Sequence, residues 1–202
     1  MPNNIESKHQ KGKKLPRVII LRGAPASGKS TVAHKLSSLL PASKKAYIAI
    51  DDLQHCDLRN FSHDKLKLGV YHAAVLCRSF IREGFDIVVD YVFDKDLEFF
   101  VEKLFHSHRS QVAACDVQIF YLEASFDVLL KRNNMRESKM KENVLKELFE
   151  ACNVLRGAYP GEVVVDTNKL SVKATAKAIL AEQTMIVDKP KILKNKNIKK
   201  KP

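Results

Sequence analysis

The chain has 202 residues, of which 45% are hydrophobic and 29% are charged. These proportions are ordinary for a globular protein, and the length suits one domain with enough chain to bury a core. No apolar run reaches the roughly 18–20 residues of a membrane span, and the polar, lysine-bearing first residues predict no secretory signal. The four cysteines form no C-x-x-C pair, so we expect reduced core thiols, a cytoplasmic location and no zinc site.

The net charge of +12 is concentrated at the two ends of the chain. Residues 1–16 hold four lysines and one glutamate, residues 185–202 hold seven lysines and one aspartate, and the rest carries a net +3. We therefore expect disordered basic tails at 1–16 and 185–202, flanking a single folded domain at 17–184. Solvated ends are the favoured interpretation of these tails, and binding of nucleic acid or anionic lipid is the alternative.

Apolar stretches typical of buried strands alternate along the chain with segments of helical spacing. Strands are predicted at about 17–22, 46–50, 87–93, 117–122 and 163–165. Helices are predicted from the residues after the first strand to about Leu40, at 64–83, at 95–109, from Ser125 towards Arg156, and from Ser171 to about Glu182. This alternation predicts an α/β protein with a five-stranded parallel sheet and right-handed crossovers.

The first strand leads directly into residues 23–31, GAPASGKST, which fit the phosphate-loop pattern G-x-x-x-x-G-K-[ST]. Gly23 and Gly28 allow backbone angles and a close approach that a Cβ would prevent. Backbone N–H groups of the loop and the start of the next helix can then face phosphate oxygens. The predicted contacts of a nucleoside triphosphate are Gly23, Ala26, Ser27, Gly28, Lys29, Ser30, Thr31 and Thr167.

Within this site we expect Lys29 to reach the β- and γ-phosphates of ATP and the Ser30 hydroxyl to ligate Mg²⁺. Asp90 ends the apolar third strand, where it would bind the magnesium through water or orient Ser30. The loop and the alternating elements together predict a P-loop NTPase three-layer sandwich with a helical lid.

The catalytic residues are expected at the carboxyl ends of the strands, where open α/β sheets bind their ligands. Asp51 and Asp52 follow the second strand. Asp51 would accept the proton of a hydroxyl group that attacks the γ-phosphate, and Asp52 could do the same or hold Mg²⁺ through water. Arg132 and Arg136 are four residues apart on a predicted helix, hence on one face. There they would form a lid that stabilises the transferred charge and excludes water.

Two other nucleotide-binding classes fit the sequence poorly. A GTPase has D-x-x-G after the third strand, where residues 90–93 read DYVF. Its guanine-recognition motif N-K-x-D is matched at 168–171 only as NKLS, without the aspartate. A motor-type ATPase has a glutamate beside the aspartate of the third strand, and Tyr91 stands there instead. A kinase remains.

Residues 46–53, AYIAIDDL, resemble the corresponding stretch of chloramphenicol phosphotransferase, as do the strands at 87–93 and 163–167. The paired aspartates and residues 130–136, LKRNNMR, resemble the kinase domain of phage-type polynucleotide 5′-hydroxyl kinase. Both resemblances imply that Asp51 is the catalytic base, and the second implies a lid arginine. Both resemblances span about residues 17–183. The sequence differs from the first family at Tyr91, where that family has an acidic residue. The arginine that follows the paired aspartates of the second family is absent as well.

The sequence therefore predicts an ATP- and Mg²⁺-dependent kinase that acts on a hydroxyl group. A small-molecule acceptor is favoured because the body of the chain lacks a strong basic excess. A polynucleotide 5′-hydroxyl is the alternative acceptor, with nucleic acid held by the lysine-rich tails. A non-catalytic nucleotide-dependent switch or interaction protein is the alternative from a different class.

Overall fold

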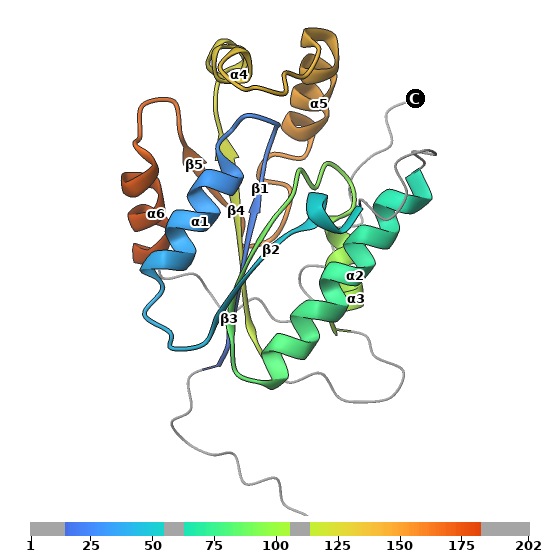
Figure 1. Cartoon of the computed structure of the whole chain (residues 1–202), viewed down its shortest axis with the longest axis vertical. Coiled ribbons are helices and arrows are strands. Elements are labelled where there is room, and N and C mark those ends of the chain that lie inside the picture. The colour runs from blue at the N-terminus through green and yellow to red at the C-terminus, as the bar shows by residue number, and fades with distance from the viewer. Residues whose placement is uncertain (1–14, 55–62, 106–113, 183–202) are drawn as a thin grey trace, which may run out of the picture.

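The computed structural model describes residues 15–54, 63–105 and 114–182. Within these ranges five parallel strands form one sheet, surrounded by six α-helices and a short 3-10 helix (Figure 1). The order across the sheet is β2-β3-β1-β4-β5, which confirms the predicted fold class. The strands are β1 (Arg17–Arg22), β2 (Lys45–Ala49), β3 (Asp86–Asp90), β4 (Asp116–Glu123) and β5 (Val163–Asp166).

The central strands β1, β3 and β4 are buried on both faces, which explains their continuous apolar runs. Parallel register places Leu21 beside Asp90 on one side of β1 and Arg22 beside Tyr121 on the other. Since all five strands run the same way, their carboxyl ends meet at one edge of the sheet. The loops that follow the strands are thereby gathered into a single site.

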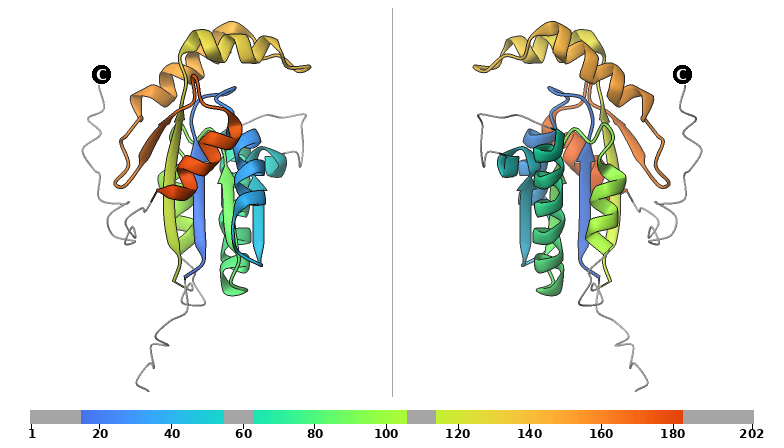
Figure 2. Two further views of the ribbon diagram at one scale, coloured as in Figure 1. Left: turned by 90° about the vertical axis from the view of Figure 1, so that its left-hand side faces the viewer. Right: turned by 90° about the vertical axis from the view of Figure 1, so that its right-hand side faces the viewer.

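Helices cover both faces of the sheet (Figures 1 and 2). α1 (Lys29–Leu39) and α6 (Val172–Ala181) pack on one face, and α2 (His63–Arg82) and α3 (Leu97–Phe105) pack on the other. Each pair buries its own apolar cluster against the strands. The 3-10 helix η1 (Ile50–Gln54) follows β2 and packs against α2.

A helical pair lies over the carboxyl edge of the sheet, as predicted for a lid (Figure 2). It consists of α4 (Phe126–Asn134) and α5 (Glu142–Val154). The Asn133 side chain closes the connection between them, donating to the Met140 carbonyl at 2.8 Å and accepting from the Met140 N–H at 3.1 Å. The base of the pair shares an apolar cluster with the alanines of the phosphate loop. The two helices and the loop are therefore packed as one unit.

The prediction that the third strand continues to residue 93 is wrong, since β3 ends at Asp90. Its neighbour β1 ends at Arg22, and the chain then turns at Gly23 with φ +137°. Phe93 itself has φ +47°, which lies outside the β region. Tyr91 and Phe93 are buried beyond the end of the strand and Val92 is partly buried, which accounts for the apolar run.

The helix starts agree with the sequence to different degrees. Ser171 caps α6, because its hydroxyl accepts a hydrogen bond from the Ala174 N–H at 3.2 Å. Ser125 stands at the start of α4, but its side chain makes no capping bond. Its N–H instead donates to the Asn168 side-chain oxygen at 2.8 Å. The sequence also favours Ser62 as the cap of the helix predicted at 64–83, and this residue lies outside the described residues.

The cysteines of the described ranges are buried free thiols, as predicted. Burial raises the pKa of Cys115 to about 12 and that of Cys152 to about 11. Cys56 and nearly all of both predicted tails lie outside the described residues.

Candidate nucleotide and acceptor site

The phosphate loop connects β1 to α1 and requires both of its glycines. A Cβ on Gly23 would lie 2.6 Å from the Leu122 carbonyl oxygen. Gly28 is the N-cap of α1 and has φ +97°. Ala26 also has a positive φ, 64°. This backbone bends the loop around the N-terminus of α1, where unpaired N–H groups favour anions.

The Lys29 side chain is buried and folded back over the loop. Its ammonium group donates to the carbonyl oxygens of Gly23 at 2.9 Å and Ala24 at 3.0 Å. Burial lowers the pKa of Lys29, and the negative charges of Asp90 and Asp51 oppose that shift. The amine therefore lies in a compact, water-poor site that is within the electrostatic reach of two of the predicted carboxylates.

Asp90 is held between two hydroxyl groups. Its Oδ2 accepts a hydrogen bond from Ser30 at 2.7 Å, and its Oδ1 accepts one from Tyr47 at 2.8 Å. Burial and this hydrogen bond both raise the pKa of Tyr47, so the phenol stays protonated and acts as the donor. The sequence analysis did not single out Tyr47.

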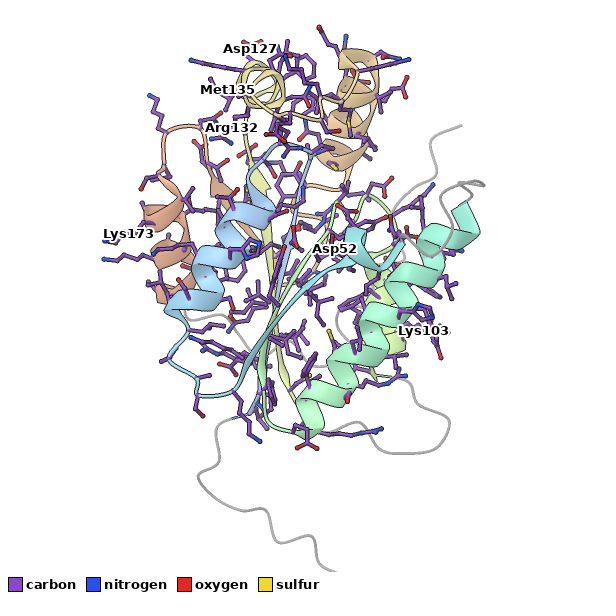
Figure 3. The ribbon with its side chains drawn as sticks, viewed as in Figure 1. Asp52, Lys103, Asp127, Arg132, Met135 and Lys173 are labelled. Carbon is purple, nitrogen blue, oxygen red and sulfur yellow. The ribbon has the colours of Figure 1, made fainter. Side chains whose placement is uncertain are left out.

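The lid faces the phosphate loop through Arg132, which lies on the side of α4 that points towards the sheet (Figure 3). Its guanidinium group donates to the Ser27 carbonyl at 3.3 Å and to the Thr167 carbonyl at 2.6 Å. The Thr167 hydroxyl donates to the Glu123 carbonyl at 2.8 Å. Arg132 thus ties the lid to both the phosphate loop and the end of β5.

The prediction that Arg132 and Arg136 share one face of a helix is wrong, because α4 ends at Asn134. Arg136 lies in the turn beyond it, where its N–H bonds the Asn133 carbonyl at 3.1 Å. Both arginines nevertheless line the same cavity of about 270 Å³ beside the phosphate loop. Its other lining residues are Ala26, Ser27, Gly28, Thr31, Val32, Thr167, Leu170, Val172 and Thr175.

A second group of candidate residues lies on η1 and in the loop after β3, which follow neighbouring strands at the same edge of the sheet. Asp51 and Asp52 are both exposed on η1, and Figure 3 shows Asp52 near the carboxyl edge of the sheet. Gln54 donates to the Tyr91 hydroxyl oxygen at 3.0 Å, which ties η1 to the end of β3.

The negative charges of three aspartates act on the Tyr91 hydroxyl. Burial raises the pKa of Tyr91 to about 12, and the negative charges of Asp51, Asp96 and Asp94 add to the rise. The negative charge of Asp51 also acts on Lys29, and Ala49, two residues before Asp51, pairs with Asp90 in the sheet. The structure therefore brings Asp51 together with Lys29, Ser30 and Asp90 at one edge of the sheet.

A buried arginine connects the lid to the rest of the site. Arg22 is 0% exposed and pairs with Glu162 at 2.7 Å. Its guanidinium also donates to the carbonyls of Phe93 and Leu155, and it stacks against the rings of Tyr121 and Tyr159. The sequence analysis missed this residue, because an arginine at the end of an apolar strand has no motif to mark it.

The oxygen ligands of this site fit Mg²⁺. This ion keeps several waters and takes one or two protein oxygens together with substrate phosphates, so it needs no cage of side chains. Ser30 and Asp90 supply such oxygens beside the phosphate loop. The described residues contain no cluster of three His, Cys, Asp or Glu side chains that could hold a metal ion.

No helix in the described part of the chain is long and apolar enough to cross a membrane. A larger cavity of about 650 Å³ lies at the opposite end of the sheet, bordered by Pro16, Pro41, Gly84 and neighbouring loop residues. It shares no residue with the phosphate loop.

Solved structures of kinases resemble this fold. A gluconokinase from Sinorhizobium meliloti 1021 is 19% identical at a TM-score of 0.59, over 84% of this chain and 94% of that one. The shikimate kinase from Acinetobacter baumannii, in complex with shikimate, is 16% identical at a TM-score of 0.56, over 82% of this chain and 91% of that one. A chain of the Pnkp1/Rnl/Hen1 RNA repair complex is 14% identical at a TM-score of 0.59, over 76% of this chain and 49% of that one. The chain therefore has a P-loop kinase fold.

The sequence comparisons are more specific about family than about activity. No curated protein matches the sequence. A family model described as an AAA domain (AAA_33) matches residues 18–155, which are more than half of the chain and include the phosphate loop, β3 and the lid. The chain belongs to this AAA domain family.

Proposed function

We propose that the protein is an ATP-dependent kinase that transfers the γ-phosphate to a hydroxyl group. The observation that carries the proposal is the placement of Asp51. It lies on η1, two residues beyond Ala49, which pairs with Asp90 in the sheet. A carboxylate at the strand ends beside a phosphate site is suited to act as the base for phosphoryl transfer to an acceptor.

The nucleotide is bound by the phosphate loop. Lys29 exchanges its two carbonyl partners for β- and γ-phosphate oxygens, where negative charge accumulates during transfer. Ala26, Ser27, Gly28, Thr31 and Thr167 border the adjoining cavity and contact the rest of the nucleotide. Ser30 and Asp90 would hold Mg²⁺ beside the loop, and the ion would supply positive charge to the phosphates.

The acceptor oxygen attacks the γ-phosphorus while its proton passes to the Asp51 carboxylate. The bond between the γ-phosphorus and the bridging oxygen breaks, and ADP leaves with that electron pair. Arg132 and Arg136 border the cavity from the lid, where they can stabilise the transferred group and exclude water. Asp52 is the alternative base on the same short helix.

A small neutral or cationic molecule with a hydroxyl group is the favoured acceptor, as in the chloramphenicol phosphotransferase family that the sequence resembles. Asp51, Asp96 and Asp94 contribute negative charge near Tyr91, in the group of residues that we assign to the acceptor. This field disfavours a polyanionic chain and favours a neutral or positively charged molecule.

The second candidate acceptor is a polynucleotide 5′-hydroxyl. The likeness to a chain of an RNA repair complex favours it, together with the lysines in the two ends of the sequence. These lysines could neutralise the phosphates of a polynucleotide, which the carboxylates near Tyr91 do not attract.

The test is transfer from γ-radiolabelled ATP to separate pools of metabolites, nucleosides, antibiotics and 5′-hydroxyl oligonucleotides. We expect label in a small hydroxyl compound, and no label with the Lys29→Ala variant as a control for contaminating kinases. Label in the oligonucleotide pool alone would replace the favoured acceptor with the second one. Label in no pool, despite ATP binding, would contradict the kinase proposal.

A further inference from the structure

The Asp90 carboxylate accepts one hydroxyl hydrogen on each of its two oxygens. The Ser30 hydroxyl donates to Oδ2 at 2.7 Å and the Tyr47 hydroxyl donates to Oδ1 at 2.8 Å. Asp90 is only 5% exposed. The side-chain torsion of an aspartate is broad and roughly two-fold, so a single donor would leave the carboxylate plane free to turn. Two donors on opposite oxygens fix it.

The sheet register explains how Tyr47 reaches this position. β2 pairs with β3 so that Tyr47 lies beside Val88 and Ala49 beside Asp90. Asp90 is two residues beyond Val88, so its side chain points to the same face of the sheet as that of Tyr47. A tyrosine is long enough to reach such a diagonal neighbour.

The ring of Tyr47 is held on its other side by α1. The His34 ring packs against it with 4.5 Å between ring centroids and a tilt of 58°. His34 lies four residues after Ser30, on the same side of α1. One helix therefore carries both the hydroxyl that meets Asp90 Oδ2 and the ring that backs the donor to Oδ1.

We propose that Tyr47 is a positioning residue for the metal site of this protein. It holds Asp90 so that Oδ2 faces the Ser30 hydroxyl. This keeps Asp90 Oδ2 and the Ser30 hydroxyl oxygen aligned for Mg²⁺. Hydrogen bonds from outside the ligand set orient metal ligands in this way in many proteins, and their loss weakens metal binding. The inference rests on the proposed nucleotide site, but it does not depend on the identity of the acceptor.

A purely structural role for the bond would be to attach the edge strand β2. β2 is already joined to β3 over five consecutive register pairs, from Lys45 beside Asp86 to Ala49 beside Asp90. Loss of one side-chain bond leaves that ladder intact. A structural role predicts lower stability with unchanged metal dependence, whereas a positioning role predicts the reverse.

The test compares wild type with Tyr47→Phe, which removes one oxygen and keeps the ring against His34. Thermal stabilisation by ATP is measured first with EDTA and then across a Mg²⁺ titration. We expect equal stabilisation in EDTA and a Mg²⁺ midpoint raised about 10-fold in the variant, the usual cost of losing such a partner. Tyr71→Phe, on the exposed side of α2, is the matched control and should leave both values unchanged.

A double variant separates positioning from other causes. In Asp90→Asn the carboxylate is gone, so adding Tyr47→Phe should move the Mg²⁺ midpoint by less than twofold. An unchanged midpoint in Tyr47→Phe, a loss of ATP binding in EDTA, or an undiminished effect in the double variant would overturn the inference. Magnesium-dependent ATP binding without phosphate transfer to any acceptor would contradict the kinase proposal, while the midpoints would still decide the role of Tyr47.

Discussion

Lys29 and its two carbonyl partners are the residue-level feature that the proposed chemistry uses most directly. Without the ammonium group, the Gly23 and Ala24 carbonyls lose a donor, but the glycine-dependent path of the loop remains. The Lys29→Ala variant should therefore fold and bind ATP more weakly, and it should transfer no phosphate. Thermal stabilisation by ATP, measured beside wild type, checks this. Equal stabilisation of the two proteins would remove Lys29 from the site.

Asp51 and Asp52 are adjacent carboxylates on one 3-10 helix, so they provide matched variants of each other. Asp51→Asn keeps the size of the side chain but cannot accept the proton of the acceptor. Turnover should fall by roughly 10²–10⁴-fold, with ATP binding unchanged. Asp52→Asn should be mild. The opposite ranking of the two turnover numbers would assign the base to Asp52.

The candidate site residues that could be predicted from the sequence are those that belong to a motif or end a strand. Lys29 and Ser30 follow from the phosphate-loop pattern, and Asp90 follows from its place after an apolar run. Tyr47 and Arg22 could not be found in this way. Their partners are 43 and 140 residues away in the sequence, and only the register of the sheet brings them together.

Among the elements, η1 and α2 meet at a glycine. A Cβ on Gly69, within α2, would lie 2.7 Å from Gln54 Cγ. Alanine in place of an interior helix glycine normally stabilises a protein by roughly 0.5–1 kcal/mol. Here Gly69→Ala should instead destabilise, because Gln54 must shift and its bond to Tyr91 is strained.

The same substitution in a Gln54→Ala background is the control. With the side chain removed, Gly69→Ala should recover the ordinary helix gain of roughly 0.5–1 kcal/mol. Chemical unfolding of the four proteins measures both effects. Destabilisation of equal size in both backgrounds would mean that the clash with Gln54 is not the cause.

The base of the lid depends on the buried pair of Arg22 and Glu162, whose side chains are both 0% exposed. Breaking such a pair leaves one charge uncompensated and typically costs about 3–5 kcal/mol. Glu162→Gln should lower the free energy of unfolding by about that amount. Arg22→Met combined with Glu162→Gln should cost less than the sum of the two single changes. Additive losses in chemical unfolding would show that the pair does not act as a unit.

Element boundaries were predicted well where periodicity alone decides them and poorly where a distant contact does. β1 and α6 agree with the prediction to within a residue. β3 stops three residues early, because Phe93 turns with its carbonyl held by Arg22. The helix expected to contain Arg136 ends at Asn134 because the Asn133 side chain bonds Met140.

For the whole molecule, alternating apolar strands and helical segments were enough to predict the sheet, since parallel strands need crossover helices. The acceptor could not be predicted, because in the proposed site it depends on side chains gathered from η1, β3 and the loop before α3. The acidic surroundings of Tyr91 became visible only in the folded chain.

Deleting the lysine-rich ends separates the two acceptors. Residues 1–14 and 189–202 can be removed without touching Pro16, whose carbonyl accepts the Asp116 N–H at 2.9 Å. Transfer to a small molecule should keep its rate. Binding of an oligonucleotide should weaken and lose most of its dependence on salt, because fewer counterions are released. Oligonucleotide phosphorylation that collapses on deletion would favour the polynucleotide acceptor.

In the proposed reaction the site passes phosphate to a hydroxyl acceptor and does not simply hydrolyse ATP. A single-turnover experiment that follows the γ-label of ATP with the acceptor pool present distinguishes the two. We expect wild type to place the label in an organic acceptor and Asp51→Asn to slow this step roughly 10²–10⁴-fold. Label released only as inorganic phosphate, at the same rate with and without acceptor, would contradict it.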